Sequence, residues 1–119
     1  MYDPITDDER TAADPMAWSE DRYALQDRYL ELTRELLPRA AERGGWRLRE
    51  NHCFMRVLLD DVCGDAWRRV LDPRLVAYKQ LTNAQLRHVV SLGERVLAEG
   101  EPLLATLNRQ SLRWRGKGG

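Results

Sequence analysis

The residues best suited to chemistry in this 119-residue chain form a polar stripe within its most apolar segment. His52, Arg56 and Asp60 follow one another at four-residue steps. In a helix, at about 100° per residue, these side chains share one face, and Cys63 joins them within an arc of about 80°. In a pocket, His52 would serve as a general base and Arg56 would bind an anion.

Two neighbouring groups extend this anion-binding hypothesis. Asn51 lies where the segment's helix is expected to start, and the free backbone amides of a helix start attract anions. Lys79 is the only lysine outside the C-terminal tail and is within predicted reach of the stripe. The alternative is a solvent-facing stripe, or an Arg56–Asp60 pair that fixes packing. The candidate ligand-binding residues are Asn51, His52, Arg56, Asp60 and Lys79.

A second candidate site is the basic C-terminal tail. Basic residues beside an aromatic ring can contact phosphates and stack a base. The competing interpretation is that the basic residues complement the dipole of a helix C-terminus, with Trp114 on the apolar face. If the last two predicted helices formed a helix-turn-helix, the acidic Glu99 and Glu101 would lie where the recognition helix meets phosphate. Nucleic-acid binding is therefore the lesser alternative. The candidate nucleic-acid residues are Arg109, Arg113, Trp114, Arg115 and Lys117.

Other kinds of site lack their sequence motifs. No C-x-x-C, H-x-x-x-H or E-x-x-H spacing is present, so no metal site is predicted, and His88 falls on a polar helix face. No G-x-S-x-G turn or glycine-rich phosphate loop occurs, so no cofactor is predicted and a non-enzymatic role is favoured. Cys53 and Cys63 would lie ~15 Å apart on one helix, too far for a disulfide.

Composition indicates one globular domain, with 43% hydrophobic residues, 32% charged residues and a formal net charge of zero. Acidic residues dominate the first 21 positions and basic residues dominate from Ala105 onward. These ends could meet each other, a neighbouring subunit or an outside partner. No signal peptide or membrane-length apolar run is present, so a cytoplasmic location is expected and no membrane partner.

Helices must position these side chains. A flexible acidic arm over residues 1–18 precedes a helix capped by Ser19, which Pro38 is expected to end or kink near Leu37, with further turns before Gly44. Residues 46–50 are predicted to form a linker.

The next predicted helix begins at an N-cap near Asn51 and runs to about Cys63. Beyond Gly64, either Asp65 caps a short separate helix or the same helix continues. Residues 75–81 form a connector.

Two helices complete the prediction. Thr82 and Gln85 match a capping box, and Gly93 on the apolar face of that helix suggests close approach of another helix. Pro102 fits the first turn of a final helix, and a frayed tail follows over residues 116–119.

The expected fold class is therefore all-α, a compact bundle of four to five short helices over residues 19–115. The expected function is a small helical interaction or binding module, a homodimer or an accessory subunit. Trp18 and Trp46, just outside helices, suggest a covered apolar pocket or a subunit interface, with packing into the core as the alternative. The alternative is a protein that binds a small anion, or a small helical enzyme, using the polar stripe.

Overall fold

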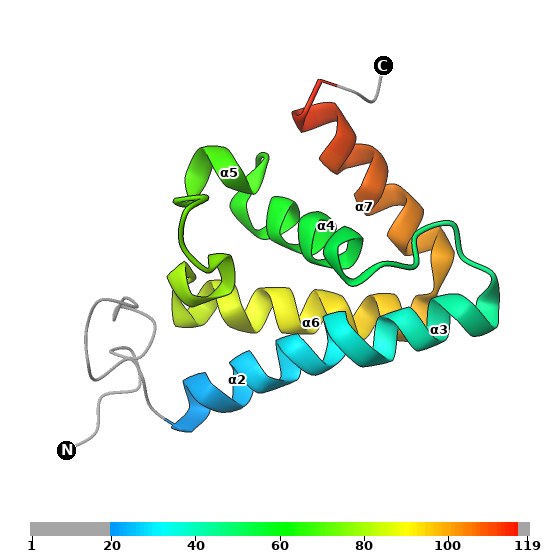
Figure 1. The fold of residues 1–119 in the computed structure, drawn as a ribbon, viewed down its shortest axis with the longest axis horizontal. Helices are drawn as coiled ribbons and strands as arrows, with labels where there is room; N and C mark the ends of the chain where they lie inside the picture. Colours follow the sequence, from blue (N-terminus) through cyan, green and yellow to red (C-terminus); the bar gives the residue numbers. More distant parts are fainter. Residues whose placement is uncertain (1–19, 117–119) are drawn as a thin grey trace.

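The computed structural model describes residues 20–116, and these are all-α without a strand (Figure 1). This confirms the predicted all-α compact bundle. The predicted arm over residues 1–18, the Ser19 cap, Trp18 and Lys117 lie outside the described residues. The elements are α2 (Glu20–Glu31), the π-helical turn η2 (Leu32–Leu36), α3 (Leu37–Gly44), α4 (Asn51–Cys63), α5 (Trp67–Val70), the 3-10 turn η3 (Ala77–Gln80), α6 (Asn83–Glu99) and α7 (Glu101–Trp114).

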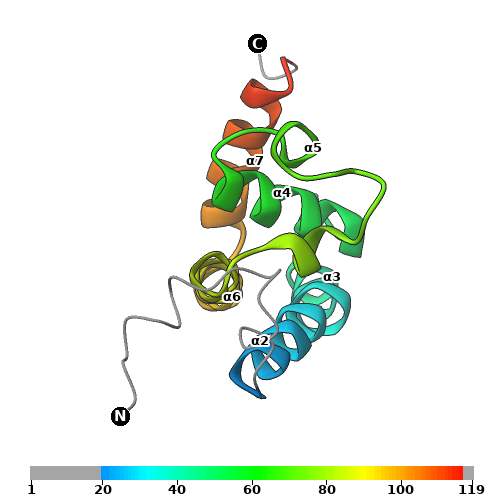
Figure 2. The ribbon, with the colours of Figure 1, turned by 90° about the vertical axis from the view of Figure 1, so that its left-hand side faces the viewer.

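The helices stack in layers. The continuous rod formed by α2, η2 and α3 lies side by side with α6 (Figure 1). α4 lies across both, and α5 and α7 lie on the side of α4 away from α2 (Figure 2). This order makes α4 the central helix, which agrees with its being the most apolar segment of the sequence. Among the described residues, no helix has the length and apolarity needed to cross a membrane.

Pro38 neither ends the first helix nor breaks its rod. A proline ring clashes with the carbonyl four residues earlier in a regular α-helix. Here the backbone widens into the π-helical turn η2, and the Leu37 N–H donates to the Leu32 carbonyl, five residues back. The rod then continues until Gly45, whose φ of 65° places it in the left-handed region. The further turns expected after Pro38 are therefore present.

The boundaries of α4 correct two predictions about caps. Glu50, with extended backbone, occupies the N-cap position, so Asn51 is the first helical residue rather than the cap. α5 is a separate helix, but the Trp67 N–H at its start is accepted by Asp60 Oδ1 at 2.8 Å. Asp65 instead accepts the Ala66 N–H at 2.7 Å. The carboxylate that holds the start of α5 thus comes from inside α4.

The two last helices follow the sequence prediction closely. Both hydrogen bonds of the Thr82–Gln85 capping box are present at the start of α6. Gly93 of α6 is buried against η2, as the predicted close approach of another helix requires. A Cβ added there would lie 3.0 Å from Leu32 Cδ1. Trp46 is part of the buried core, so for this tryptophan the alternative of core packing is the one observed.

Candidate functional site

Two members of the predicted polar stripe of α4, Arg56 and Asp60, face α7, whereas His52 is exposed. Arg56 Nη1 donates to Ser111 Oγ at 2.6 Å, and Arg56 Nη2 donates to Asn108 Oδ1 at 2.8 Å. Ser111 in turn donates to Asp60 Oδ2 at 2.6 Å. Arg56 and Asp60 are therefore connected through a hydroxyl group of α7, instead of pairing directly along α4.

Asp60 is the centre of this network, with none of its surface exposed. Arg115 Nε donates to Asp60 Oδ2 at 2.8 Å, and Arg115 Nη2 donates to Oδ1 at 2.9 Å. With Ser111 and the Trp67 backbone, four donors satisfy the carboxylate. Hydrogen bonding to Asp60 raises the pKa of Arg115 despite the partial burial of its guanidinium. The carboxylate thus joins α4, the start of α5 and the end of α7.

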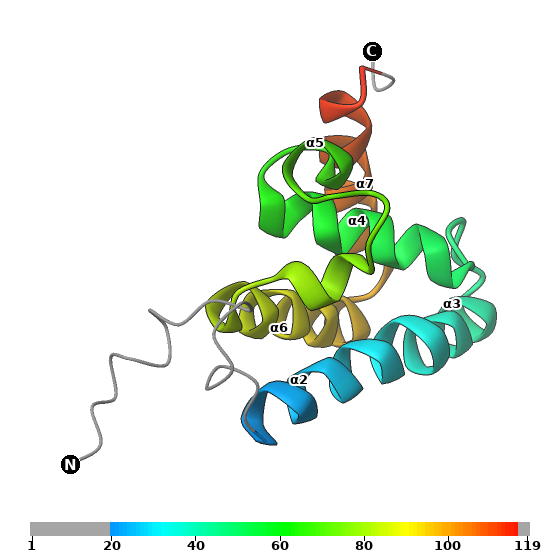
Figure 3. The ribbon, with the colours of Figure 1, turned by 60° about the vertical axis from the view of Figure 1, so that its left-hand side comes forward.

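A pocket of about 400 Å³ opens beside this network, a volume typical of small-molecule sites. Side chains from η2, α4, α5, η3 and the end of α7 line it. Figure 3 shows the segment from α5 to η3 running beside α4. No carboxylate occurs among the described residues of the lining. Its basic side chains are Arg34, His52, Arg56, Arg68 and Arg115, and we call this site the arginine pocket.

The remaining lining of the arginine pocket is apolar or aromatic. Leu59 is buried, while Met55, Trp67 and Tyr78 are half-buried. Arg34, His52 and Arg68 are exposed. The pocket therefore has an apolar floor and a basic rim. Its apolar and aromatic residues are Met55, Leu59, Trp67, Val76, Ala77 and Tyr78.

The structure brings together only part of the predicted ligand-binding set. His52 and Arg56 line the pocket, whereas Asp60 lies buried behind it. Asn51 and Lys79 are exposed and do not belong to the lining. The Lys79 carbonyl accepts Arg22 Nη2 at 3.1 Å.

Sequence reasoning missed Arg34 and Arg68. Arg34 is four residues after Leu30 and three before Leu37, so in a helix it lies on the same face as these two leucines. A basic residue on an apolar face was the signal that could have identified it. Arg68 follows Trp67 in a short helix, and its guanidinium lies 5.2 Å from the centroid of that ring. No periodic pattern in so short a helix could have assigned Arg68 to the pocket.

The nucleic-acid candidates of the C-terminal segment are dispersed. Arg115 binds Asp60, and the Trp114 carbonyl accepts Arg69 Nη1 at 2.9 Å. Arg109 donates to Thr106 Oγ1 on the surface of α7, and Arg113 is exposed. Lys117 lies outside the described residues.

Two other sets of reactive side chains have simple surroundings. His88 Nε2 and Asp61 Oδ2 lie 3.1 Å apart at the surface. Cys53 and Cys63 are free and half-buried, and burial raises the pKa of the Cys63 thiol to about 11. Across residues 20–116, no three histidine, cysteine or acidic side chains are grouped to hold a metal ion.

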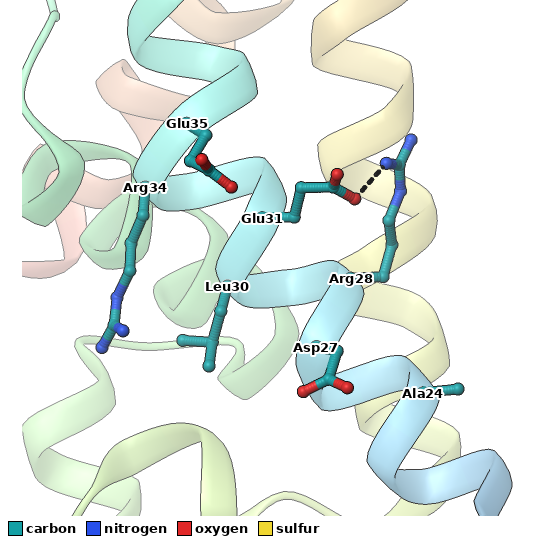
Figure 4. Close-up of a pocket in the computed structure, with 7 residues that line it drawn as sticks. All are labelled: Ala24, Asp27, Arg28, Leu30, Glu31, Arg34 and Glu35. Atoms are coloured by element: carbon teal, nitrogen blue, oxygen red, sulfur yellow. Dashed lines mark hydrogen bonds and ion pairs between the residues drawn. The ribbon is translucent and has the colours of Figure 1, made fainter.

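A larger hollow of about 640 Å³ lies on the outer face of α2 and η2. Its residues all come from this one rod, and Arg28 there donates to Glu31 Oε1 at 2.6 Å (Figure 4). Arg34 points to a different side of the helix from Glu31 (Figure 4), toward the arginine pocket that it also lines. A depression on a single helix with paired charges offers a ligand less enclosure than the arginine pocket does.

Comparison of the chain with protein-family models, with curated protein sequences and with solved structures gives no match.

Proposed function

We propose that this protein binds a small organic anion in the arginine pocket. One observation carries the proposal. Four arginines and one histidine from separate segments line a single pocket above an apolar floor, without a carboxylate among the described lining residues. An apolar pocket with a few convergent polar groups is the usual form of a small-molecule site. The excess of basic groups favours an anionic ligand, and the apolar floor favours a ligand with a hydrocarbon part.

Two of the arginines are held in place by the protein itself. Arg56 is bound by Asn108 and Ser111, and Arg115 is bound by Asp60. A guanidinium group has five N–H donors, and each of these arginines uses two of its own in these bonds. Donors are left for a ligand, and the fixed side chains lose little conformational entropy on binding.

Binding is a better match to these residues than catalysis. A catalytic histidine is normally oriented by a third group that accepts its second N–H. His52 is exposed, and within residues 20–116 it has no hydrogen-bond partner. We therefore assign His52 to the rim of the pocket as one more polar contact for the anion.

The proposal is tested with the aromatic anion 1-anilinonaphthalene-8-sulfonate as a probe, using its fluorescence and the protein's amide NMR spectrum. We expect saturable binding that weakens with added salt, because the contacts are partly exposed charges. Arg34→Gln and Arg68→Gln should each weaken binding about fivefold, since a charge-assisted contact at a partly exposed site contributes about 1 kcal/mol.

Arg43→Gln is the matched control, because Arg43 is an exposed arginine on α3 outside the pocket. This variant should bind the probe as the unchanged protein does. Absence of saturable binding would contradict the proposal, and so would equal affinity in all three variants.

A homodimeric interaction module is the second candidate. Val70, Leu75 and Val76 are exposed by 51%, 60% and 52%; Val70 is the last residue of α5, and the other two follow it closely in the sequence. Exposed apolar clusters are typical of protein interfaces. Sedimentation velocity over a range of concentrations tests this function. A dimer that dissociates in Leu75→Asp would support it, and a monomer at all concentrations would exclude it.

A further inference from the structure

We infer that the ligand of the arginine pocket is an aryl phosphate or a similarly dianionic aromatic acid, without polar groups along its ring edge. The inference rests on the proposed function and specifies the ligand class. It follows from three features of the lining: the number of uncompensated charges, the two aromatic side chains and the kinds of polar group present.

The first feature is charge. Asp60 compensates Arg115, with which it forms two hydrogen bonds. Arg34 and Arg68 have no carboxylate partner within residues 20–116, and the two partners of Arg56 are neutral side chains. A single carboxylate would leave most of this positive charge without a counterpart. A phosphate monoester carries about −1.5 to −2 charges at pH 7 and has three strong acceptor oxygens.

The second feature is a pair of half-buried aromatic rings, Trp67 and Tyr78. The Trp67 backbone N–H is fixed by Asp60 at 2.8 Å. The Tyr78 ring lies 5.5 Å from the ring of Tyr29, which is 1% exposed. Aromatic rings favour stacked or edge-to-face partners over aliphatic ones, so these walls select a ring.

The third feature separates an aryl acid from a nucleotide. The amino groups of nucleotide bases are recognised by carboxylate and side-chain amide oxygens, which accept their N–H groups. The described lining contains neither a side-chain amide nor a carboxylate, and its floor consists of Met55 and Leu59 beside the aromatic rings. The arginines can donate to ring nitrogens, but the amino group of a base such as adenine would be buried without a carboxylate or amide oxygen to accept it, which opposes binding. A hydrocarbon ring has no such groups.

Isothermal titration calorimetry with four probes tests the inference: 1-naphthyl phosphate, 1-naphthalenesulfonate, octyl phosphate and adenosine 5′-monophosphate. We expect 1-naphthyl phosphate to bind most tightly. Octyl phosphate has the same charged group without a ring and should bind about fivefold more weakly. The sulfonate has the ring with a single charge and should lose at least about fivefold at low salt.

Two variants of Trp67 supply the matched controls. Trp67→Leu should remove the preference for naphthyl over octyl phosphate, whereas Trp67→Phe should keep it. Circular dichroism of both variants confirms that the helices remain. Tyr78→Leu is a second variant with the same expected loss, should Trp67→Leu fail to fold.

The outcomes also distinguish the two proposals. If octyl phosphate or the nucleotide binds as tightly as 1-naphthyl phosphate and Arg34→Gln weakens that binding, the anion site stands and the aromatic inference is overturned. If no probe binds, both proposals fail. If the sulfonate equals the phosphate, the dianionic part of the inference is overturned.

Discussion

Replacement of Asp60 by asparagine tests the structural part of this account most directly. Asparagine has the same size as aspartate, so Asp60→Asn creates no cavity and changes only charge and hydrogen bonding. The Asp60 carboxylate is fully buried and accepts two bonds from Arg115 and one from Ser111. The amide would present an NH₂ group to at least one of these donors, and the Arg115 guanidinium would lose its counter-ion.

The expected magnitude follows from the burial of the pair. Removing one member of a buried ion pair costs about 3–5 kcal/mol. The Arg115 side chain keeps 21% exposure and can turn partly toward water, so the lower end of about 3 kcal/mol applies. A domain is typically stable by about 5–15 kcal/mol, so this is a large share.

Urea denaturation measures the change, followed by tryptophan fluorescence and far-UV circular dichroism. With a urea m-value of about 1–3 kcal/mol/M, the midpoint should fall by roughly 1–3 M. Asp61→Asn is the matched control. Asp61 is the next residue on α4, and its partner His88 is exposed, so its loss should cost below about 1 kcal/mol.

The reasoning would be refuted by an Asp60→Asn protein within about 0.5 kcal/mol of the unchanged one, the range typical of ordinary surface substitutions. It would also be refuted if Asp61→Asn cost as much. As a further check, Arg115→Gln combined with Asp60→Asn should cost clearly less than the sum of the two single changes, because both remove the same interaction.

Three further predictions concern stability and reactivity. Hydrogen bonds from Arg28 hold the pKa of Glu94 below its ordinary value of 4.5, so the pair stabilises the fold above that pH and loses its effect as pH falls through the lowered pKa. Glu94→Gln should therefore cost less than about 1 kcal/mol in urea unfolding at pH 7, and nothing at a pH below that lowered pKa. The Cys63 thiol, with its pKa raised to about 11, should react with iodoacetamide at pH 8 about 100-fold more slowly in the folded than in the unfolded protein, as mass spectrometry can follow. Gly93→Val should lower stability by roughly 1–3 kcal/mol in thermal unfolding, because its Cβ would already meet a Leu32 methyl group at 3.0 Å.

Most of the helices could be predicted from the sequence because their ends are fixed by residues close to one another in the chain. The Thr82–Gln85 capping box involves residues three apart, and the glycine after Cys63 adopts the left-handed backbone that ends α4. Pro38 shows the limit of such rules. The proline rule describes a regular α-helix, whereas the chain widens one turn to accommodate the ring.

The candidate site could be predicted only in the part that one helix contributes. The spacing of His52 and Arg56 places both on one face of α4, and both do line the pocket. Arg34 and Arg68 reach it from other segments, through packing that no local pattern specifies. Likewise, Ser111 and Arg115 become partners of Asp60 only because α7 lies along α4.

The contact between Asp60 and Arg115 also sets when the pocket can form during synthesis. The two residues are 55 positions apart in the chain. At about 5–20 residues per second, the ribosome adds that stretch in roughly 3–11 s. Until then the carboxylate on the central helix has no guanidinium partner, and burying it alone is unfavourable. That face of α4 must therefore stay hydrated on the nascent chain until Arg115 has been added, so the pocket cannot form before α7 is in place.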